Sequence, residues 1–369
     1  MHSRSIPCVL QLLGLVLLSL EWGVDCFQPH LIPATESRTL FRKQSSTACT
    51  SRDRPVSSVL SVSSRGINGS TLNGAADHVA LNAPASFLTK IGMISFVASM
   101  CLALPATLLP QLLLFRLGII SRTRKERWAL ATSQFCARFV HRLFPFCKIS
   151  VKTDVANEAN PLPAVWACNH TSMLDVFILL IADRKLRGPK KRPIKIVYWK
   201  NLEDNPVTAL LFRQAGFIPV AMAANKPGEE NQYDKGSFKQ LLKSCKQAFD
   251  EGFDIGILPE GQLNPEPEKG LLPIFTGAFT LARLSKRPIR LMALNGLHRM
   301  WHPVKGMHVT GRQAKIRAYG QGRSYESADE FKATFERVVG EFGSKGDDLE
   351  TKELAGWLSG EAWKRKKAA

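Results

Sequence analysis

Closely spaced cysteine pairs are absent from the sequence. The eight cysteines are scattered singly along 369 residues, whereas structural zinc sites and redox motifs need cysteines a few residues apart. We therefore expect reduced thiols and no structural metal. No cofactor is expected either. The sequence also contains no internal repeat, which argues against a solenoid or another repeat array.

Acidic residues are in the minority: 31 Asp and Glu stand against 50 Lys and Arg, which gives a net charge of +19. The excess persists after residue 120, where 41 basic residues face 26 acidic ones. Such a charge favours an anionic partner: a membrane, a phosphorylated substrate or a nucleic acid. No recognisable nucleic-acid-binding motif is present and the chain carries a long apolar segment, so we do not expect a nucleic-acid partner.

The first 85 residues have the composition of targeting segments. Residues 1–26 combine a basic start, an apolar run and small residues, which predicts a secretory signal peptide. Residues 37–76 hold 14 Ser or Thr, six Lys or Arg and one acidic residue, as in an organellar transit peptide. The two in series, joined at Phe27, resemble the bipartite leader of proteins imported into complex plastids, so residues 27–85 are expected to be a disordered transit peptide and linker. A secreted protein with a Ser-rich stalk is the alternative.

Charge is absent from residues 91–115, between Lys90 and Arg116. This run is longer than a helix needs to cross the hydrocarbon core of a bilayer. Pro105 and Pro110 divide it, which leaves a re-entrant hairpin and a kinked single span as alternatives. The residues that follow are basic and amphipathic at helical spacing, as expected for a helix at a lipid headgroup layer. We therefore expect residues 86–148 to form a membrane-associated helical segment.

Short apolar runs alternate with helical patterns over residues 149–345. The runs predict strands at 164–168, 194–199, 217–221, 253–258, 289–295 and 315–319. Helical patterns fall near 173–184, 206–215, 237–250, 275–285 and 326–342. This alternation predicts an α/β domain with a mostly parallel sheet flanked by helices. Residues 346–369 are predicted to be a basic C-terminal tail.

A histidine and an aspartate separate two apolar runs in CNHTSMLD, which ends at Asp175. His170 directly follows a predicted strand, and Asp175 falls in the first turn of the next helix, which Thr171 or Ser172 can cap. The strand-to-helix corner brings the carboxylate back to the imidazole. There it fixes the tautomer and leaves the other ring nitrogen free to accept a proton. No nucleophile accompanies the pair, so we infer that the substrate supplies a hydroxyl.

Pro259, Glu260 and Gly261 end another predicted strand. The proline fixes the turn, and Gly261 permits a backbone to approach a ligand closely. In an α/β sheet, ligands bind where the strands reach their carboxyl ends. The histidine, the aspartate and this loop are therefore expected to form one site.

Four ordered blocks resemble the glycerophospholipid acyltransferase family, of the lysophosphatidate (1-acyl-sn-glycerol-3-phosphate) acyltransferase type. They are the His-x4-Asp of His170 and Asp175, the GFIPV of 216–220, the Pro-Glu-Gly of 259–261 and the LPIFTGAF of 272–279. Their order and approximate spacing match the family, and the resemblance covers roughly residues 86–345.

The resemblance implies transfer of a fatty acyl group from acyl carrier protein (ACP) or coenzyme A to the sn-2 hydroxyl of lysophosphatidate, at a membrane. His170 is then the general base and Asp175 orients it. Glu260, Gly261 and Gly216 belong to the acceptor-binding elements. Backbone N–H groups near the start of the helix are the expected donors to the oxyanion. With the leader, this implies the envelope of a complex plastid, and the endoplasmic reticulum membrane is the alternative.

The expected phosphate ligands depart from the family pattern. Lys200 occupies the family's lysine position and is expected to face the acceptor phosphate, but Met222 and Leu263 stand where the resemblance implies arginines. Arg213 and the basic run 184–195 are further cations that can supply positive charge. A different lysolipid, such as a lysoglycolipid, is therefore an alternative acceptor. A catalytically dead lipid-binding protein with the same fold is a second alternative.

Overall fold

The computed structural model of the chain describes residues 87–155, 162–188, 191–204, 206–221, 235–307, 310–320 and 322–368. The predicted leader, residues 1–85, lies outside these ranges, and so does Met222.

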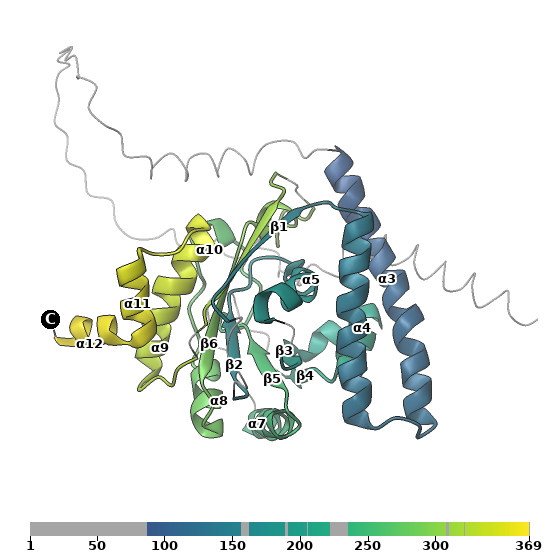
Figure 1. Ribbon diagram of the computed structural model, residues 1–369, viewed down its shortest axis with the longest axis horizontal. Coiled ribbons are helices and arrows are strands. Elements are labelled where there is room, and N and C mark those ends of the chain that lie inside the picture. The colour runs from purple at the N-terminus through teal and green to yellow at the C-terminus, as the bar shows by residue number, and fades with distance from the viewer. Residues whose placement is uncertain are drawn as a thin grey trace, which may run out of the picture.

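A seven-stranded sheet forms the centre of the domain, in the order β1-β7-β6-β2-β5-β3-β4 (Figure 1). Its strands are β1 (Lys148–Thr153), β2 (Val165–Cys168), β3 (Ile194–Trp199), β4 (Ile218–Val220), β5 (Asp254–Ile257), β6 (Ile289–Asn295) and β7 (Gln313–Ala318). Neighbouring strands are parallel except for β6 and β7, which are antiparallel. The predicted mostly parallel α/β sheet is therefore confirmed. All six predicted strands are present, and β1 is an additional edge strand.

The central strands carry the apolar core. Every residue of β2 and β6 is buried, as expected for strands of a parallel sheet that is covered on both faces. β1 has half-buried and exposed residues in strict alternation. A strand that buries only one face gives a weaker apolar signal in the sequence, which is why β1 was not predicted.

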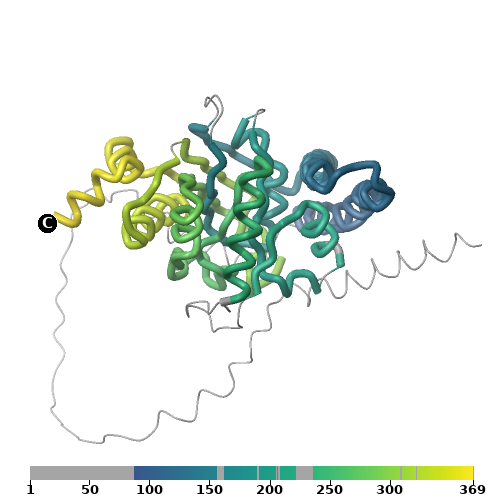
Figure 2. Tube along the Cα trace, turned by 90° about the horizontal axis from the view of Figure 1, so that it is seen from below, coloured from purple at the N-terminus to yellow at the C-terminus, as the bar shows by residue number. Residues whose placement is uncertain are grey.

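Helices cover both sides of the sheet (Figures 1 and 2). One side carries α5 (Asp175–Arg187) and α6 (Pro206–Ala215), followed outwards by α3 (Phe87–Arg116) and α4 (Arg122–Leu143). The opposite side carries α8 (Gly277–Ser285), α9 (Ala328–Phe335), the π-helical turn η4 (Glu336–Gly340) and α10 (Glu341–Lys345). α7 (Lys235–Asp250) packs on β4 and β5.

Two further helices, α11 (Thr351–Ser359) and α12 (Glu361–Ala368), lie in the segment that the sequence analysis treated only as a basic tail. α12 has no buried residue and carries three of its four cations in its last turn. Its sequence therefore lacks the apolar stripe by which a helix is usually recognised. In Figure 1 it points away from the body, on the side opposite to α3 and α4.

α3 is one continuous helix that passes through Pro105 and Pro110. The alternative of a hairpin that turns within this run is therefore wrong. Met100, Leu104 and Leu108 form a buried stripe at helical spacing, and α3 packs along α4. This packing keeps the helix continuous although each proline removes one backbone donor. α3 is also the helix, within the described part of the chain, whose length and apolar composition would suffice to span a membrane.

α4 buries polar as well as apolar residues against the domain and leaves several aromatic side chains exposed. Glu126, Ser133 and Gln134 are buried, whereas Phe135 and Phe139 are more than half exposed. The two exposed phenyl rings stack on each other, with their centroids 6.1 Å apart. A soluble protein normally buries such rings, so this face of α4 is suited to an apolar environment.

Candidate functional site

The site lies at the edge where the parallel strands reach their carboxyl ends. His170 follows β2 and Glu260 follows β5, two strands that pair with each other. Lys200, the first residue of the 3-10 helix η1 (Lys200–Asp204), follows β3 on the other side of β5. If the pairing register continues past the strand ends, these three residues are level with one another, with roughly 10 Å between the axes of β2 and β3.

The imidazole of His170 is held by the carboxylate of Asp175. His170 Nδ1 lies 2.9 Å from Asp175 Oδ2, and the same oxygen accepts the N–H of Thr171 at 2.7 Å and the N–H of Ser172 at 3.0 Å. Asp175 is buried, whereas the His170 side chain is 20% exposed. A carboxylate at Nδ1 favours the tautomer with its proton on that nitrogen, so Nε2 is free to accept a proton at the solvent side.

The predicted cap of the helix is wrong. α5 begins at Asp175, its N-cap residue is Leu174, and no side chain caps it. Ser172 Oγ instead accepts the N–H of Leu174 at 3.2 Å and donates to the carbonyl oxygen of Trp301 at 2.7 Å. The corner is therefore organised by Asp175 itself and by the segment that follows β6.

Glu260 contacts the backbone around His170. Its buried carboxylate accepts the N–H of His170 at 2.7 Å through Oε1 and the N–H of Leu272 at 3.0 Å through Oε2. Burial raises the pKa of this carboxyl, and the two N–H groups oppose that rise in part. Gly261 follows with a φ of 69°, a value that favours glycine. The predicted Pro-Glu-Gly loop thus touches the predicted base directly.

The side chains next to His170 that could act as nucleophiles are engaged elsewhere. The hydroxyl of Ser172 donates to Trp301 O at 2.7 Å, and that of Thr171 lies 3.4 Å from Asp175 Oδ1. Burial raises the pKa of the Cys168 thiol well above its usual range, and the nearby Asp175 carboxylate raises it further. This arrangement agrees with the inference that the attacking hydroxyl belongs to the substrate.

The expected oxyanion donors near the helix start are largely occupied. The N–H of His170 donates to Glu260, those of Thr171 and Ser172 to Asp175, that of Leu174 to Ser172 Oγ, and that of Asp175 to Ser172 O. These five amides hold the corner in shape, so they are not free to stabilise an oxyanion.

The described residues of the basic run 184–195 lie at the wrong edge for a phosphate ligand. α5 begins at the site and ends at the opposite edge of the sheet, where these basic residues lie. β3 then leads the chain back towards the edge that carries the site. Arg187 Nε lies 2.7 Å from Asp183 Oδ1, Lys191 also pairs with Asp183, and Lys195 Nζ lies 2.7 Å from Glu126 Oε2. Burial alone would raise the pKa of Asp183, but the neighbouring cations hold it below its usual value. These three cations are therefore paired with carboxylates inside the fold.

Arg213 is likewise engaged, because its guanidinium pairs with Glu203 in η1. Lys200 is exposed at the same edge of the sheet as His170. Leu263, in the loop after β5, is half-buried. Of the cations that the sequence analysis named, Lys200 is thus the one whose position suits the acceptor.

Gly216 is not brought to the site. Val197 pairs with Ile218, so Gly216 lies level with Lys195 at the start of β3. This is roughly 15 Å along the strands from the level of His170. Its φ is 67°, and a Cβ there would overlap the Glu126 carboxyl group, at 2.7 Å from Oε1. In this structure Gly216 makes room for the buried pair of Glu126 and Lys195.

Two buried asparagines at the site were not predicted. Asn169 bonds to β6 in both directions: Nδ2 donates to Leu294 O at 2.9 Å, and Oδ1 accepts the N–H of Leu294 at 2.8 Å. Asn264 donates its backbone N–H to His170 O at 3.2 Å. Both flank predicted functional residues in the sequence, but only the tertiary structure reveals their partners.

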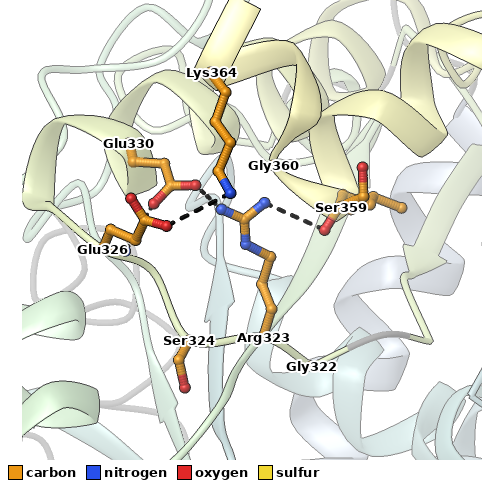
Figure 3. Close-up of a pocket in the computed structure, with 9 residues that line it drawn as sticks. Gly322, Arg323, Ser324, Glu326, Glu330, Ser359, Gly360 and Lys364 are labelled. Atoms are coloured by element: carbon orange, nitrogen blue, oxygen red, sulfur yellow. Dashed lines mark hydrogen bonds and ion pairs between the residues drawn. The ribbon is translucent and has the colours of Figure 1, made fainter.

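A cavity of about 340 Å³ lies at the opposite edge of the sheet (Figure 3). Arg323, which bridges to the first residue of β6, dominates it. Its guanidinium pairs with Glu330 and donates to Trp357 O at 3.1 Å and to Leu358 O at 3.3 Å. These contacts engage both terminal nitrogens of the guanidinium, and Lys364, the other cation of the lining, lies 3.8 Å from Glu326 Oε1. The cavity therefore offers a ligand little unpaired charge. Within the described ranges, no cluster of three or more His, Cys, Asp or Glu side chains is arranged to hold a metal ion.

Part of this chain is similar to known acyltransferases. Residues 151–294 match the protein-family model described as Acyltransferase. A chloroplastic 1-acyl-sn-glycerol-3-phosphate acyltransferase of Brassica napus is 24% identical over 154 residues, which cover 42% of this chain and 39% of that protein. A chloroplastic enzyme of the same description from Arabidopsis thaliana is 25% identical over 153 residues, 41% of this chain and 37% of that protein. This chain thus aligns with about two fifths of the length of these relatives.

Among solved structures, a crystal structure of the 1-acyl-sn-glycerophosphate acyltransferase of Thermotoga maritima is similar, with a TM-score of 0.48 and 14% identity over 68% of this chain and 94% of that chain. Residues 151–294 are thus similar to acyltransferase domains. The two plant relatives are described as 1-acyl-sn-glycerol-3-phosphate acyltransferases.

The position of Gly216 leads to a stability prediction. Gly216→Ala should lower the free energy of unfolding by about 1–2 kcal/mol for the left-handed backbone, and by about 1–3 kcal/mol more for overpacking against Glu126. Gly118→Ala is the matched control, because Gly118 has a φ of 71° and nothing within 4 Å of its Cβ position. Chemical unfolding in detergent measures both. Equal losses for the two variants would contradict the packing role. A raised KM for the acceptor without loss of stability would instead support the predicted acceptor-binding role.

Proposed function

We propose that this protein transfers a fatty acyl group from an acyl thioester to the sn-2 hydroxyl of lysophosphatidate, which makes phosphatidate. The observation that carries the proposal is the 2.9 Å contact between His170 Nδ1 and the buried carboxylate of Asp175, at the carboxyl edge of the sheet. The two plant relatives, both described as 1-acyl-sn-glycerol-3-phosphate acyltransferases, support the choice of acceptor.

The proposed reaction needs one base and no nucleophile from the protein. His170 Nε2 takes the proton of the acceptor hydroxyl as its oxygen attacks the thioester carbonyl carbon. The tetrahedral intermediate collapses, the carbon–sulfur bond breaks, and the leaving thiolate takes the proton back from the imidazolium. The products are an ester and a free thiol of ACP or coenzyme A. Asp175 stabilises the imidazolium between the two proton transfers without itself being protonated.

Lys200 is the proposed ligand of the acceptor phosphate. It is exposed at the edge that carries His170, whereas Arg187, Lys191 and Lys195 are paired at the other edge. A phosphate-free lysolipid, such as a lysoglycolipid, is the second candidate acceptor. The half-buried Leu263 in the loop after β5 favours it, because an apolar side chain supplies no donor to a phosphate.

We further propose that α3 and α4 hold the enzyme at a membrane. α3 has the length and composition of a spanning helix, and α4 exposes Phe135 and Phe139. The chloroplastic descriptions of the relatives and the predicted leader favour a plastid envelope. Import of a fluorescent protein fused after residue 85 into the plastid of a complex-plastid alga tests this location, and arrest in the endoplasmic reticulum contradicts it.

His170→Ala should reduce acyl transfer by about 10²- to 10⁴-fold, because the proton acceptor is lost. Asp175→Asn should also be severe, since an amide can present its NH2 to Nδ1 and hold the wrong tautomer. Initial rates with lysophosphatidate and both thioester donors measure the effect, and unfolding midpoints control for folding. Retention of more than a few per cent of activity by His170→Ala would rule out this mechanism.

Lys200→Met should raise the KM for lysophosphatidate by about tenfold to a hundredfold, since a charge-assisted contact contributes about 1.5 to 3 kcal/mol. The KM for a phosphate-free lysolipid should change little. Arg213→Met is the matched control, because that cation is already held by Glu203. Unchanged lysophosphatidate kinetics in Lys200→Met, with a phosphate-free lysolipid as the better substrate, would overturn the lysophosphatidate assignment but leave acyl transfer standing.

Replacing Phe135 and Phe139 together by Gln should raise the KM for lysophosphatidate presented in phosphatidylcholine–phosphatidylglycerol vesicles by about tenfold to a hundredfold, because apolar contact with the bilayer is lost. A short-chain, water-soluble acceptor should be unaffected. Leu284→Gln is the control: Leu284 and Phe135 are both 61% exposed, but Leu284 lies on α8 at the other side of the sheet. The same loss in the control variant would refute the proposed membrane face.

A further inference from the structure

The main chain of His170 is held on both sides by the loop that follows β5. Its N–H donates to Glu260 Oε1 at 2.7 Å, and its carbonyl oxygen accepts the N–H of Asn264 at 3.2 Å. The ring is held separately by Asp175. The position of the imidazole therefore depends on the shape of this loop as well as on the carboxylate at Nδ1.

Asn264 is the residue that fixes the shape of the loop. Its side chain is buried. Nδ2 donates to Gly270 O at 2.6 Å and lies 3.4 Å from Glu260 Oε2, and Oδ1 accepts the N–H of Glu266 at 3.0 Å. One amide thus closes the loop on itself and also holds the carboxylate that binds His170. An amide can do this because it carries donors and an acceptor on one short side chain.

We propose that Asn264 is a positioning residue for His170. It closes the loop over residues 259–272 and holds the carboxylate of Glu260 in place. In this way it fixes the position and orientation of the imidazole relative to the substrate. This inference rests on the proposed function of His170 as the base, and it adds a residue that contacts neither the reacting atoms nor the His170 ring. Misplacement of a reacting group by about 1 Å can cost roughly a hundredfold in rate.

Asn264→Asp is the informative variant, because it keeps the shape of the side chain and removes the donors. In its ionised form, the introduced carboxyl group would set a second negative charge beside Glu260 and could not donate to Gly270 O. In its protonated form, it regains a donor. The titratable groups that bear on the Glu260 carboxyl are His170 and Asp175, and Glu260 in turn acts on Cys168. All four are present in the parent protein, so the ratio of variant to parent activity isolates the new carboxyl.

We expect Asn264→Asp to lower kcat by about tenfold to a hundredfold, with the KM for the acceptor close to that of the parent. The activity ratio should recover as the pH falls, because the new carboxyl takes up a proton. Asn264→Ala should lose activity at every pH, since it has no donor to regain. A merely structural role would give both variants the same pH-independent ratio.

Asn295→Asp is the matched control. Asn295 is also buried, at the end of β6, and its Nδ2 donates to Gly343 O at 2.7 Å, but it does not belong to the loop. Similar losses of kcat in Asn264→Asp and Asn295→Asp, at similar unfolding midpoints, would overturn the proposal.

Hydrogen exchange of the peptide that contains His170 gives a readout independent of catalysis. Its amide should exchange faster in Asn264→Asp and Asn264→Ala than in the parent or in Asn295→Asp, because Glu260 is released. Unchanged exchange overturns the positioning role even if activity falls. If the parent protein transfers no acyl group at all, the proposed function fails, and the exchange result still decides whether Asn264 holds the loop.

Discussion

The buried carboxylate of Asp175 is the constraint on which the site depends. A carboxylate without hydrogen-bond partners is costly to bury. The Asp175 carboxylate has three partners, the ring nitrogen Nδ1 of His170 and the backbone N–H groups of Thr171 and Ser172. The chain between β2 and α5 must therefore fold into a tight corner. In that corner the neighbouring hydroxyls of Thr171 and Ser172 are bonded to Asp175 and Trp301, so we infer that the second reactant brings its own hydroxyl.

The two edges of the sheet differ in function: one carries the candidate site and the other carries buried ion pairs that hold helices to the sheet. The carboxyl edge holds His170, Glu260 and Lys200, whereas the opposite edge holds buried ion pairs such as that of Lys195 with Glu126 of α4. α4 buries Glu126 in this ion pair and leaves Phe135 and Phe139 exposed. Under the membrane attachment that we propose, the ion pairs that fasten α4 to the sheet also set the orientation of these two rings. Gly216 contributes to the packing at this opposite edge, since it lies against Glu126.

Sequence patterns were sufficient for six of the seven strands and for the contact between His170 and Asp175, because both are recognisable from short stretches of the chain. The six core strands are visible as apolar runs, and the short spacing between His170 and Asp175 allows their contact at a strand-to-helix corner. The predictions that were wrong concerned the placement of residues at the site, which depends on the topology of the sheet. Whether a cation lies at the edge that carries His170 depends on the direction of the preceding helix, and α5 takes the described residues of the run 184–195 to the opposite edge. The register of β4 with β3 places Gly216 at that opposite edge as well. The bonds of Glu260 and Asn264 to His170 join residues far apart in the sequence, and no local pattern encodes them.

The central claim is that the acceptor hydroxyl, and no group of the protein, attacks the thioester. The intact mass of the purified protein after incubation with an acyl thioester, with and without lysophosphatidate, tests it most directly. Our account predicts an unchanged protein mass in both samples, with free thiol and acylated acceptor formed only when the acceptor is present. A protein that gains the mass of one acyl group when the acceptor is withheld, and loses it when the acceptor is added, would contradict the account.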